Sequence, residues 1–162
     1  MGIEILKVGM ADLNSARHPC MITTLGLGSC VGVALYDSVA KVVGLAHVML
    51  PCSEQARNNN NVAKFADTAI IKLLEDMVKL GAKRERIVAK LAGGAQMFAF
   101  SQSSDLMRIG YRNAVASKEK LQELKIPVVS EDTGGNYGRT IELYSDDGRL
   151  MIKTIGSGVK QL

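Results

Sequence analysis

The sequence predicts an α+β fold with a β-sandwich-like core and helices packed on its outside. Most of the chain consists of short segments rich in β-branched residues, and two further segments have helical periodicity. Of the 162 residues, 47% are apolar, which is enough to form a hydrophobic core without disulfide bonds or metals. Because no repeat or linker divides the chain, we expect a single domain over residues 1–162.

Eight segments are predicted to be strands, at 3–8, 21–25, 31–36, 41–50, 87–92, 128–131, 139–144 and 150–155. Those at 31–36 and 42–50 are apolar on both faces, so we expect them to be central strands that are covered on both sides. The last two strands are joined by the turn residues Asp146, Asp147 and Gly148, which predict a hairpin.

The clearest helix is predicted over 62–80, where apolar residues recur at three- and four-residue steps before Gly81. The polar run at 58–61 is expected to cap it. A weaker helix is predicted from about 111 to 125, and Pro127 follows its end.

The composition argues against several classes of function. The net charge is only +4 and the chain has few aromatic residues, so we expect no nucleic-acid binding. No apolar run is long enough to span a membrane and the N-terminus lacks a signal-peptide core, so we expect a cytoplasmic protein without membrane insertion. The cysteines and histidines of the chain are Cys20, Cys30, Cys52, His18 and His47. Their spacing is not that of metal ligands, so we expect no metal and no cofactor.

Two glycines, Gly26 and Gly28, precede Cys30 and permit a tight turn with close approach of a ligand. The same stretch lacks the lysine of a phosphate-binding loop, and Val31 stands where the dinucleotide fingerprint needs its last glycine. These differences argue against a nucleotide site.

A hairpin between 31–36 and 41–50 brings Cys30 close to His47. If Tyr36 pairs with Lys41 across the turn, Cys30 falls directly opposite His47, and opposed side chains share a face. An imidazole beside a thiol stabilises the thiolate as an ion pair and later protonates a leaving group. The pattern therefore indicates a nucleophilic cysteine. The alternative is that Cys30 is a small core residue and His47 an ordinary buried histidine, and the residues alone leave both open.

Six motifs then follow one another along the chain. They are T-x-G-L-G-S-C-V (24–31), G-L-A-H-V-M-L-P (44–51), K-F-A-D-T-A (64–69), K-L-A-G-G-A-Q-M-F (90–98), I-G-Y-R-N (109–113) and E-D-T-G-G-N (131–136). Together they resemble the CheD family of chemoreceptor glutamine deamidases, and the resemblance covers essentially the whole chain.

The resemblance implies an enzyme that converts glutamine side chains of chemoreceptor cytoplasmic domains to glutamate and releases ammonia. It also implies a side activity on receptor glutamyl methyl esters and a fold like the catalytic domain of deamidating toxins. The catalytic set of the family falls on Cys30, His47 and Thr24, with Thr24 orienting the imidazole. Backbone N–H groups at 28–30 are then candidates to hold an oxyanion.

The resemblance also implies a CheC-type phosphatase as a partner. A second hypothesis is therefore a non-catalytic or weakly catalytic regulator that binds this phosphatase. A third is a cysteine amidase that acts on free glutamine or peptides. Phe98 and Tyr137 are candidates to line the pocket, and the turns at 93–94 and 134–135 are expected near it.

Overall fold

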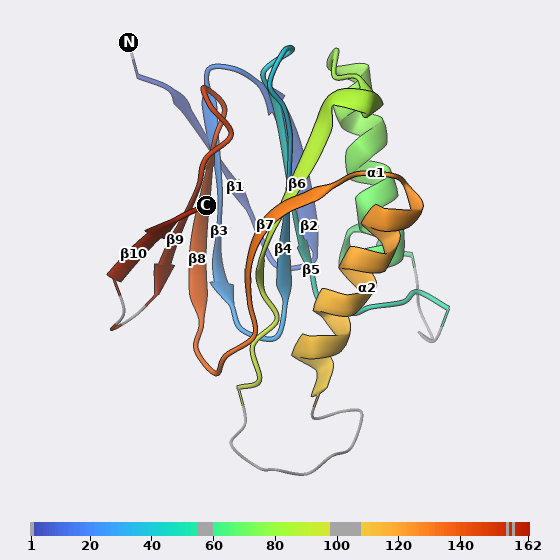
Figure 1. Ribbon diagram of the computed structural model, residues 1–162, viewed down its shortest axis with the longest axis vertical. Coiled ribbons are helices and arrows are strands. Elements are labelled where there is room, and N and C mark those ends of the chain that lie inside the picture. The colour runs from blue at the N-terminus through green and yellow to red at the C-terminus, as the bar shows by residue number, and fades with distance from the viewer. Residues whose placement is uncertain (1, 55–59, 98–107, 155, 157) are drawn as a thin grey trace.

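The chain forms two facing β-sheets, with two helices on the outer face of the second sheet (Figure 1). The computed structural model describes residues 2–54, 60–97, 108–154, 156 and 158–162. The first sheet has the order β1 (Glu4–Val8), β3 (Cys20–Leu27), β8 (Arg139–Tyr144), β9 (Leu150–Thr154) and β10 (Gly158–Gln161). The second has the order β2 (Asp12–Arg17), β5 (Val42–Val48), β4 (Val31–Asp37), β6 (Ile87–Gly93) and β7 (Val128–Thr133). The predicted α+β class, with its sheet core and outer helices, is confirmed.

The central strands β4 and β5 are buried along their whole length, as their two apolar faces predict. In β4, Val33 and Leu35 pack toward the helices, whereas Ala34 and Tyr36 pack toward the first sheet. The second sheet therefore lies between two apolar layers. One of them is shared with the helices and the other with the first sheet, and the second layer also contains Cys30.

The predicted helix over 62–80 is divided at Phe65, which is extended. Val62–Lys64 form a 3-10 turn (η1), and the α-helix α1 runs over Ala66–Lys79. The division arises because the chain after β5 takes the backbone hydrogen bonds at this point. The N–H of Met49 donates to the carbonyl of Lys64 at 2.8 Å, so that carbonyl does not serve a continuous helix.

Asn61 caps η1, since its side chain accepts a hydrogen bond from the N–H of Ala63, whereas α1 begins after Phe65 without a side-chain cap. Asn58 and Asn59 lie outside the described residues. The second helix, α2 (Ile109–Glu123), begins two residues earlier than predicted and ends before Pro127. A search of the described helices finds none that is long and apolar enough to cross a membrane.

Two strands were not predicted, β2 and β10. The residues of β2 are partly or fully exposed, and all four of β10 are exposed. Both strands lie at the edge of a sheet, so neither carries the apolar alternation by which a half-buried strand is recognised.

The predicted register of the β4–β5 hairpin is wrong by two residues. Tyr36 pairs with Val43 rather than with Lys41, and His47 lies opposite Gly32 rather than Cys30. The loop has the expected four residues but begins one residue later, because Asp37 is itself still paired, with Val42. Oδ1 of Asp37 accepts the N–H groups of Val39 and Ala40 and so starts the turn at this position.

Asp37 fixes this turn from a fully buried position. Its carboxylate also accepts the N–H of Lys83 at 2.8 Å and forms an ion pair with Arg86. Burial raises the pKa of the carboxyl, but the hydrogen bonds from Arg86 and the backbone outweigh it and lower the pKa to about 2. The charged form of Asp37 therefore stabilises the folded chain.

We expect Asp37→Asn to lower the free energy of unfolding at pH 7 by about 2 kcal/mol or more. The contribution of a depressed carboxyl pKa is present above the unfolded value and is lost as the pH falls through the folded value. The difference in the free energy of unfolding between wild type and Asp37→Asn should therefore shrink as the pH falls from the ordinary carboxyl pKa range to pH 2. Urea unfolding at a series of pH values measures it. Asp146→Asn, at an exposed turn, is the control and should change little; equal effects of the two substitutions at pH 7 would contradict the prediction.

Candidate active site

The predicted site residues lie at one end of the sandwich, where β3 turns into β4 (Figure 1, lower end). Thr24 is near the end of β3, Cys30 is in the loop that follows, and His47 is the penultimate residue of β5. All three side chains are buried. Thr24 belongs to the first sheet and His47 to the second, so the site is built between the sheets.

A hydrogen bond between Thr24 and His47 fixes the state of the imidazole. Oγ1 of Thr24 lies 2.7 Å from the carbonyl oxygen of Val8 and 2.7 Å from Nδ1 of His47. A carbonyl oxygen can only accept, so the one proton of the hydroxyl goes to Val8, and Nδ1 of His47 must be the donor to Oγ1. The proton of the neutral imidazole is thereby assigned to Nδ1, and Nε2 carries a lone pair.

Nε2 of His47 is buried and has no hydrogen-bond partner among the described residues. A buried acceptor without a partner costs free energy and is uncommon away from functional sites. The structure therefore presents an imidazole whose Nδ1–H is fixed by Thr24 and whose Nε2 is an acceptor without a partner in the described part of the chain.

The loop that carries Cys30 has its carbonyls fixed from outside. The N–H of Ala95 donates to the carbonyl oxygen of Gly28 at 2.9 Å, and the N–H of Gly94 donates to the carbonyl oxygen of Cys30 at 2.8 Å. The N–H groups of Gly28 and Ser29, in contrast, have no acceptor within the described part of the chain. N–H groups without an acceptor are suitable donors for an oxyanion.

Close backbone contacts hold this loop in place. A Cβ atom at Gly93 would lie 2.3 Å from the carbonyl oxygen of Cys30, and the φ of Gly93 is +108°. A Cβ atom at Gly110, in the first turn of α2, would lie 2.3 Å from the carbonyl oxygen of Ala95. Glycine at 93 lets the end of β6 pack directly against the site loop, and glycine at 110 lets the start of α2 pack against residues 94–95, which are bonded to that loop. The turn at 93–94 thus lies beside the site, as predicted.

The shifted hairpin register still leaves Cys30 and His47 on the same face. Gly32 opposes His47, and Cys30 precedes Gly32 by two residues, so the two side chains are diagonal rather than directly opposed. No hydrogen bond joins them in the described structure. Burial raises the pKa of the Cys30 thiol, partly offset by its own backbone N–H, and burial lowers the pKa of His47. Both shifts favour a neutral thiol and a neutral imidazole at rest, not the ion pair that the sequence suggested.

Asn113 on α2 is a site residue to which the sequence analysis gave no role. Its Nδ2 donates to the carbonyls of Ser29 and Met49, both at 2.9 Å, and the side chain is fully buried. It therefore ties the loop of Cys30 to the chain that leaves β5 just after His47. The signal was present in the sequence as an asparagine on the buried face of a helix, where a polar side chain needs partners.

A buried arginine closes the sandwich next to this loop. Nη1 of Arg139 donates to the carbonyl of Gly93 at 3.3 Å, and Nε lies 3.2 Å from a carboxylate oxygen of Asp132. The guanidinium lies 4.4 Å from the ring centre of Tyr137. Tyr137 is thus near the site loop, whereas Phe98, the other predicted lining residue, lies outside the described residues.

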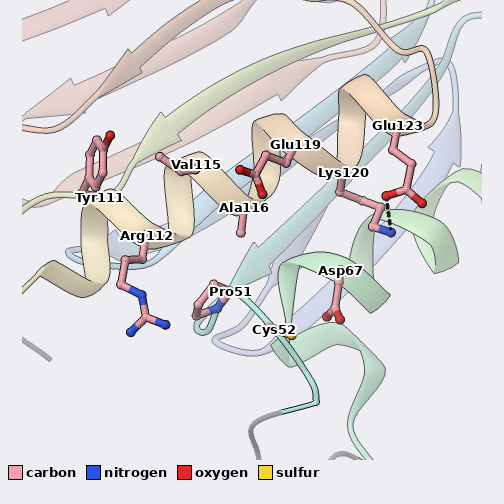
Figure 2. Close-up of a pocket in the computed structure, with 10 residues that line it drawn as sticks. All are labelled: Pro51, Cys52, Asp67, Tyr111, Arg112, Val115, Ala116, Glu119, Lys120 and Glu123. Carbon is pink, nitrogen blue, oxygen red and sulfur yellow. Dashed lines mark hydrogen bonds and ion pairs between the residues drawn. The ribbon is translucent and has the colours of Figure 1, made fainter. Parts of the chain in front are cut away.

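A separate groove of about 360 Å³ lies between α2 and the chain that follows β5 (Figure 2). Its lining mixes charges of both signs, including Asp67, Arg112 and Glu119. Cys30, His47 and Thr24 do not line it. Nor do the described residues contain a cluster of three or more His, Cys, Asp or Glu side chains arranged to hold a metal ion.

Comparison with known proteins identifies the family. The family model described as CheD chemotactic sensory transduction matches residues 49–154. A protein of Caldanaerobacter subterraneus subsp. tengcongensis, named probable chemoreceptor glutamine deamidase CheD, is 59% identical over 162 residues and covers all of both chains. The chain belongs to the CheD family. A second relative, the chemoreceptor glutamine deamidase CheD of Halalkalibacterium halodurans, is 53% identical to this CheD-family chain over 98% of its length and 99% of the relative's.

Among solved structures, the Neisseria meningitidis protein NMB0706 superposes on the CheD-family chain with a TM-score of 0.53. The match covers 83% of this chain and 65% of that one at 10% identity. At this identity the likeness concerns the fold alone, and it agrees with a sheet core that has its helices outside.

We expect Asn113→Asp to lower the free energy of unfolding of the CheD-family chain by about 3–5 kcal/mol at neutral pH. The carboxylate would face two carbonyl oxygens at 2.9 Å without a proton to donate, in a position closed to water. Gln122→Glu makes the same chemical change at an exposed position of α2 and should have a small effect. Equal stability of the two variants in urea unfolding would contradict the role assigned to Asn113.

We expect alkylation of Cys30 by iodoacetamide to accelerate at a higher pH in the folded protein than in the unfolded protein, because burial raises the pKa of the thiol. Mass spectrometry of the Cys30 peptide across a pH series measures this shift. A rate that is already maximal at neutral pH, and that falls in His47→Gln, would instead indicate a preformed thiolate–imidazolium pair.

Proposed function

We propose that this chain is a cysteine-dependent hydrolase that converts glutamine side chains of chemoreceptors to glutamate. The observation that carries the proposal is the unpartnered Nε2 of His47, fixed by Thr24 and on the same face as Cys30, in a member of the CheD family. The relatives named above are chemoreceptor glutamine deamidases, and their similarity extends over the whole chain.

The first half of the reaction forms a thioester. Nε2 of His47 takes the proton of the Cys30 thiol while Sγ bonds to the carboxamide carbon. The resulting oxyanion is held by the N–H groups of Gly28 and Ser29, which have no other acceptor in the described chain. The imidazolium then passes its proton to the nitrogen, the C–N bond breaks and ammonia leaves.

The second half reverses these roles with water. His47 takes a proton from water as the oxygen attacks the thioester carbon, and then returns that proton to sulfur when the C–S bond breaks. The acid that is released gives its proton to ammonia, so the sum is glutamine plus water giving glutamate plus ammonium, with the enzyme unchanged. The product has one more negative charge than the substrate, which alters repulsion between neighbouring receptor helices.

The proposed enzyme acts in the cytoplasm on the cytoplasmic domains of chemoreceptors. Binding to a CheC-type phosphatase stays a prediction. It is tested separately by a pull-down with Cys30→Ala, which removes the nucleophile and leaves the outer surface intact.

We expect Cys30→Ala and His47→Gln each to lower the rate of glutamine conversion by about a thousandfold or more, because each removes one half of the base–nucleophile pair. The measurement is mass spectrometry of a receptor cytoplasmic fragment after incubation, with each gain of glutamate located by peptide. Cys52→Ser is the matched control, since Cys52 is a second free cysteine outside the site, and it should retain activity. Equal conversion by wild type and Cys30→Ala would overturn the proposal.

A further inference from the structure

Several large apolar side chains remain exposed around the end of the sandwich that carries Cys30. Their exposed fractions are 61% for Met10, 63% for Leu25, 43% for Val62, 47% for Met97 and 37% for Tyr137. Single exposed apolar residues are ordinary on protein surfaces, but a group of them at one end of a molecule is typical of an interaction site. We call these five residues the apolar rim.

Two members of the apolar rim adjoin Thr24 and His47. Leu25 follows Thr24 directly, at the irregularity where the pairing of β3 with β8 shifts. Met10 lies in the turn between β1 and β2. That turn is bonded to the site on both sides, through the carbonyl of Val8 to Thr24 and through the N–H of Ala11 to the carbonyl of His47.

Val62 extends the rim beyond this turn. It directly follows Asn61, and Nδ2 of Asn61 donates to the carbonyl of Ala11 at 3.0 Å. The start of η1 is thus held against the β1–β2 turn that carries Met10.

The other two members lie on the side of the Cys30 loop. The side chain of Met97 packs on Gly28, since a Cβ atom built there would lie 3.2 Å from Cγ of Met97. Tyr137 packs on Gly135 in the same way, and the carbonyl of Gly135 accepts the N–H of Gln96. Rim residues therefore approach the site from the first sheet, from the chain before α1 and from the chain after β6.

We propose that the apolar rim binds the polypeptide segment that carries the target glutamine, through apolar side chains that flank this glutamine. The inference rests on the proposed function. A glutamine side chain is short, so the backbone of the substrate must lie at this end of the sandwich when the carboxamide reaches Sγ of Cys30. The residues that flank the glutamine then meet the rim, and none of the five rim side chains carries a charge to bind an ionic flank.

The chemistry of the rim also fits the direction of the reaction. The product carries a new carboxylate, and the five rim side chains contact the flanks without a charge of their own, so their contacts with the flanks are the same for glutamine and glutamate. Substrate selection then depends on the residues beside the glutamine.

The test compares two double variants on a chemoreceptor cytoplasmic fragment. Leu25→Thr with Met97→Ser removes apolar surface from the rim. Val78→Ser with Val159→Thr removes a similar surface from α1 and β10, where the exposed fractions are 47% and 59%. We expect the rim variant to raise KM for the fragment about tenfold and the control variant to change it less than twofold.

Iodoacetamide alkylation of Cys30 checks that each variant keeps an intact site, and Met97→Gln, a change of similar size, provides a second measurement if the double variant unfolds. If wild type is active and KM is unchanged in the rim variant, the proposed role of the rim is wrong, whereas the proposed function is unaffected. A wild type that converts no receptor glutamine overturns both. A rim variant that changes the oligomeric state by light scattering, while KM stays constant, assigns the rim to a second copy of this chain.

Discussion

The hydroxyl of Thr24 has one proton, and the arrangement of the site depends on where that proton goes. It is donated to the carbonyl of Val8, which leaves the oxygen free to accept Nδ1–H of His47. Because β1 and β3 belong to the first sheet and β5 to the second, the bond that sets the imidazole tautomer also joins the two sheets. One hydrogen bond therefore both connects the two sheets and prepares the base. A histidine fixed in this way does not need to reorient when a proton arrives at Nε2.

A neutral hydroxyl behind the imidazole has different consequences from a carboxylate. A carboxylate would stabilise the imidazolium and raise the pKa of the histidine, whereas here burial is the cause that acts, and it lowers the pKa of His47. Burial acts on Cys30 in the opposite sense, so both groups are kept neutral at rest. A protonated thiol is a poor nucleophile and is also less prone to oxidation. In the proposed reaction charge separates only during attack, which is when the free N–H groups of the loop are needed.

The sequence was sufficient for the fold class and the central strands, because burial on both faces leaves a direct mark in it. For the candidate site, the turn glycines and the predicted hairpin pointed to Cys30 and His47, whereas Thr24 followed only from the family resemblance. The sequence was insufficient for β2 and β10, since an edge strand is stabilised by one neighbour and has little apolar pattern. The hairpin register failed because the side chain of Asp37 starts the turn one residue later than expected, which strand periodicity does not report. Cys30 and His47 kept their common face because the register error was two residues, and only an odd slip reverses a face. Asn113 was missed because its two acceptors are backbone carbonyls far away in the chain.

The position of the Cys30 loop and the surface around it depend on different parts of the chain. The position of Cys30 is set by backbone groups, since the carbonyls at 28–30 are each held by an N–H group from 94–95 or by Asn113. Glycines at 93 and 110 allow these approaches, since a side chain at 93 would meet the carbonyl of Cys30 and one at 110 would meet residues 94–95. The rim is built differently: its five side chains project from the turns and strand ends that surround the loop, and they are exposed. A change at the rim removes contact surface without removing a hydrogen bond on which the loop depends. Substitutions at the rim can therefore change which polypeptide segment is bound without changing the geometry around the thiol of Cys30.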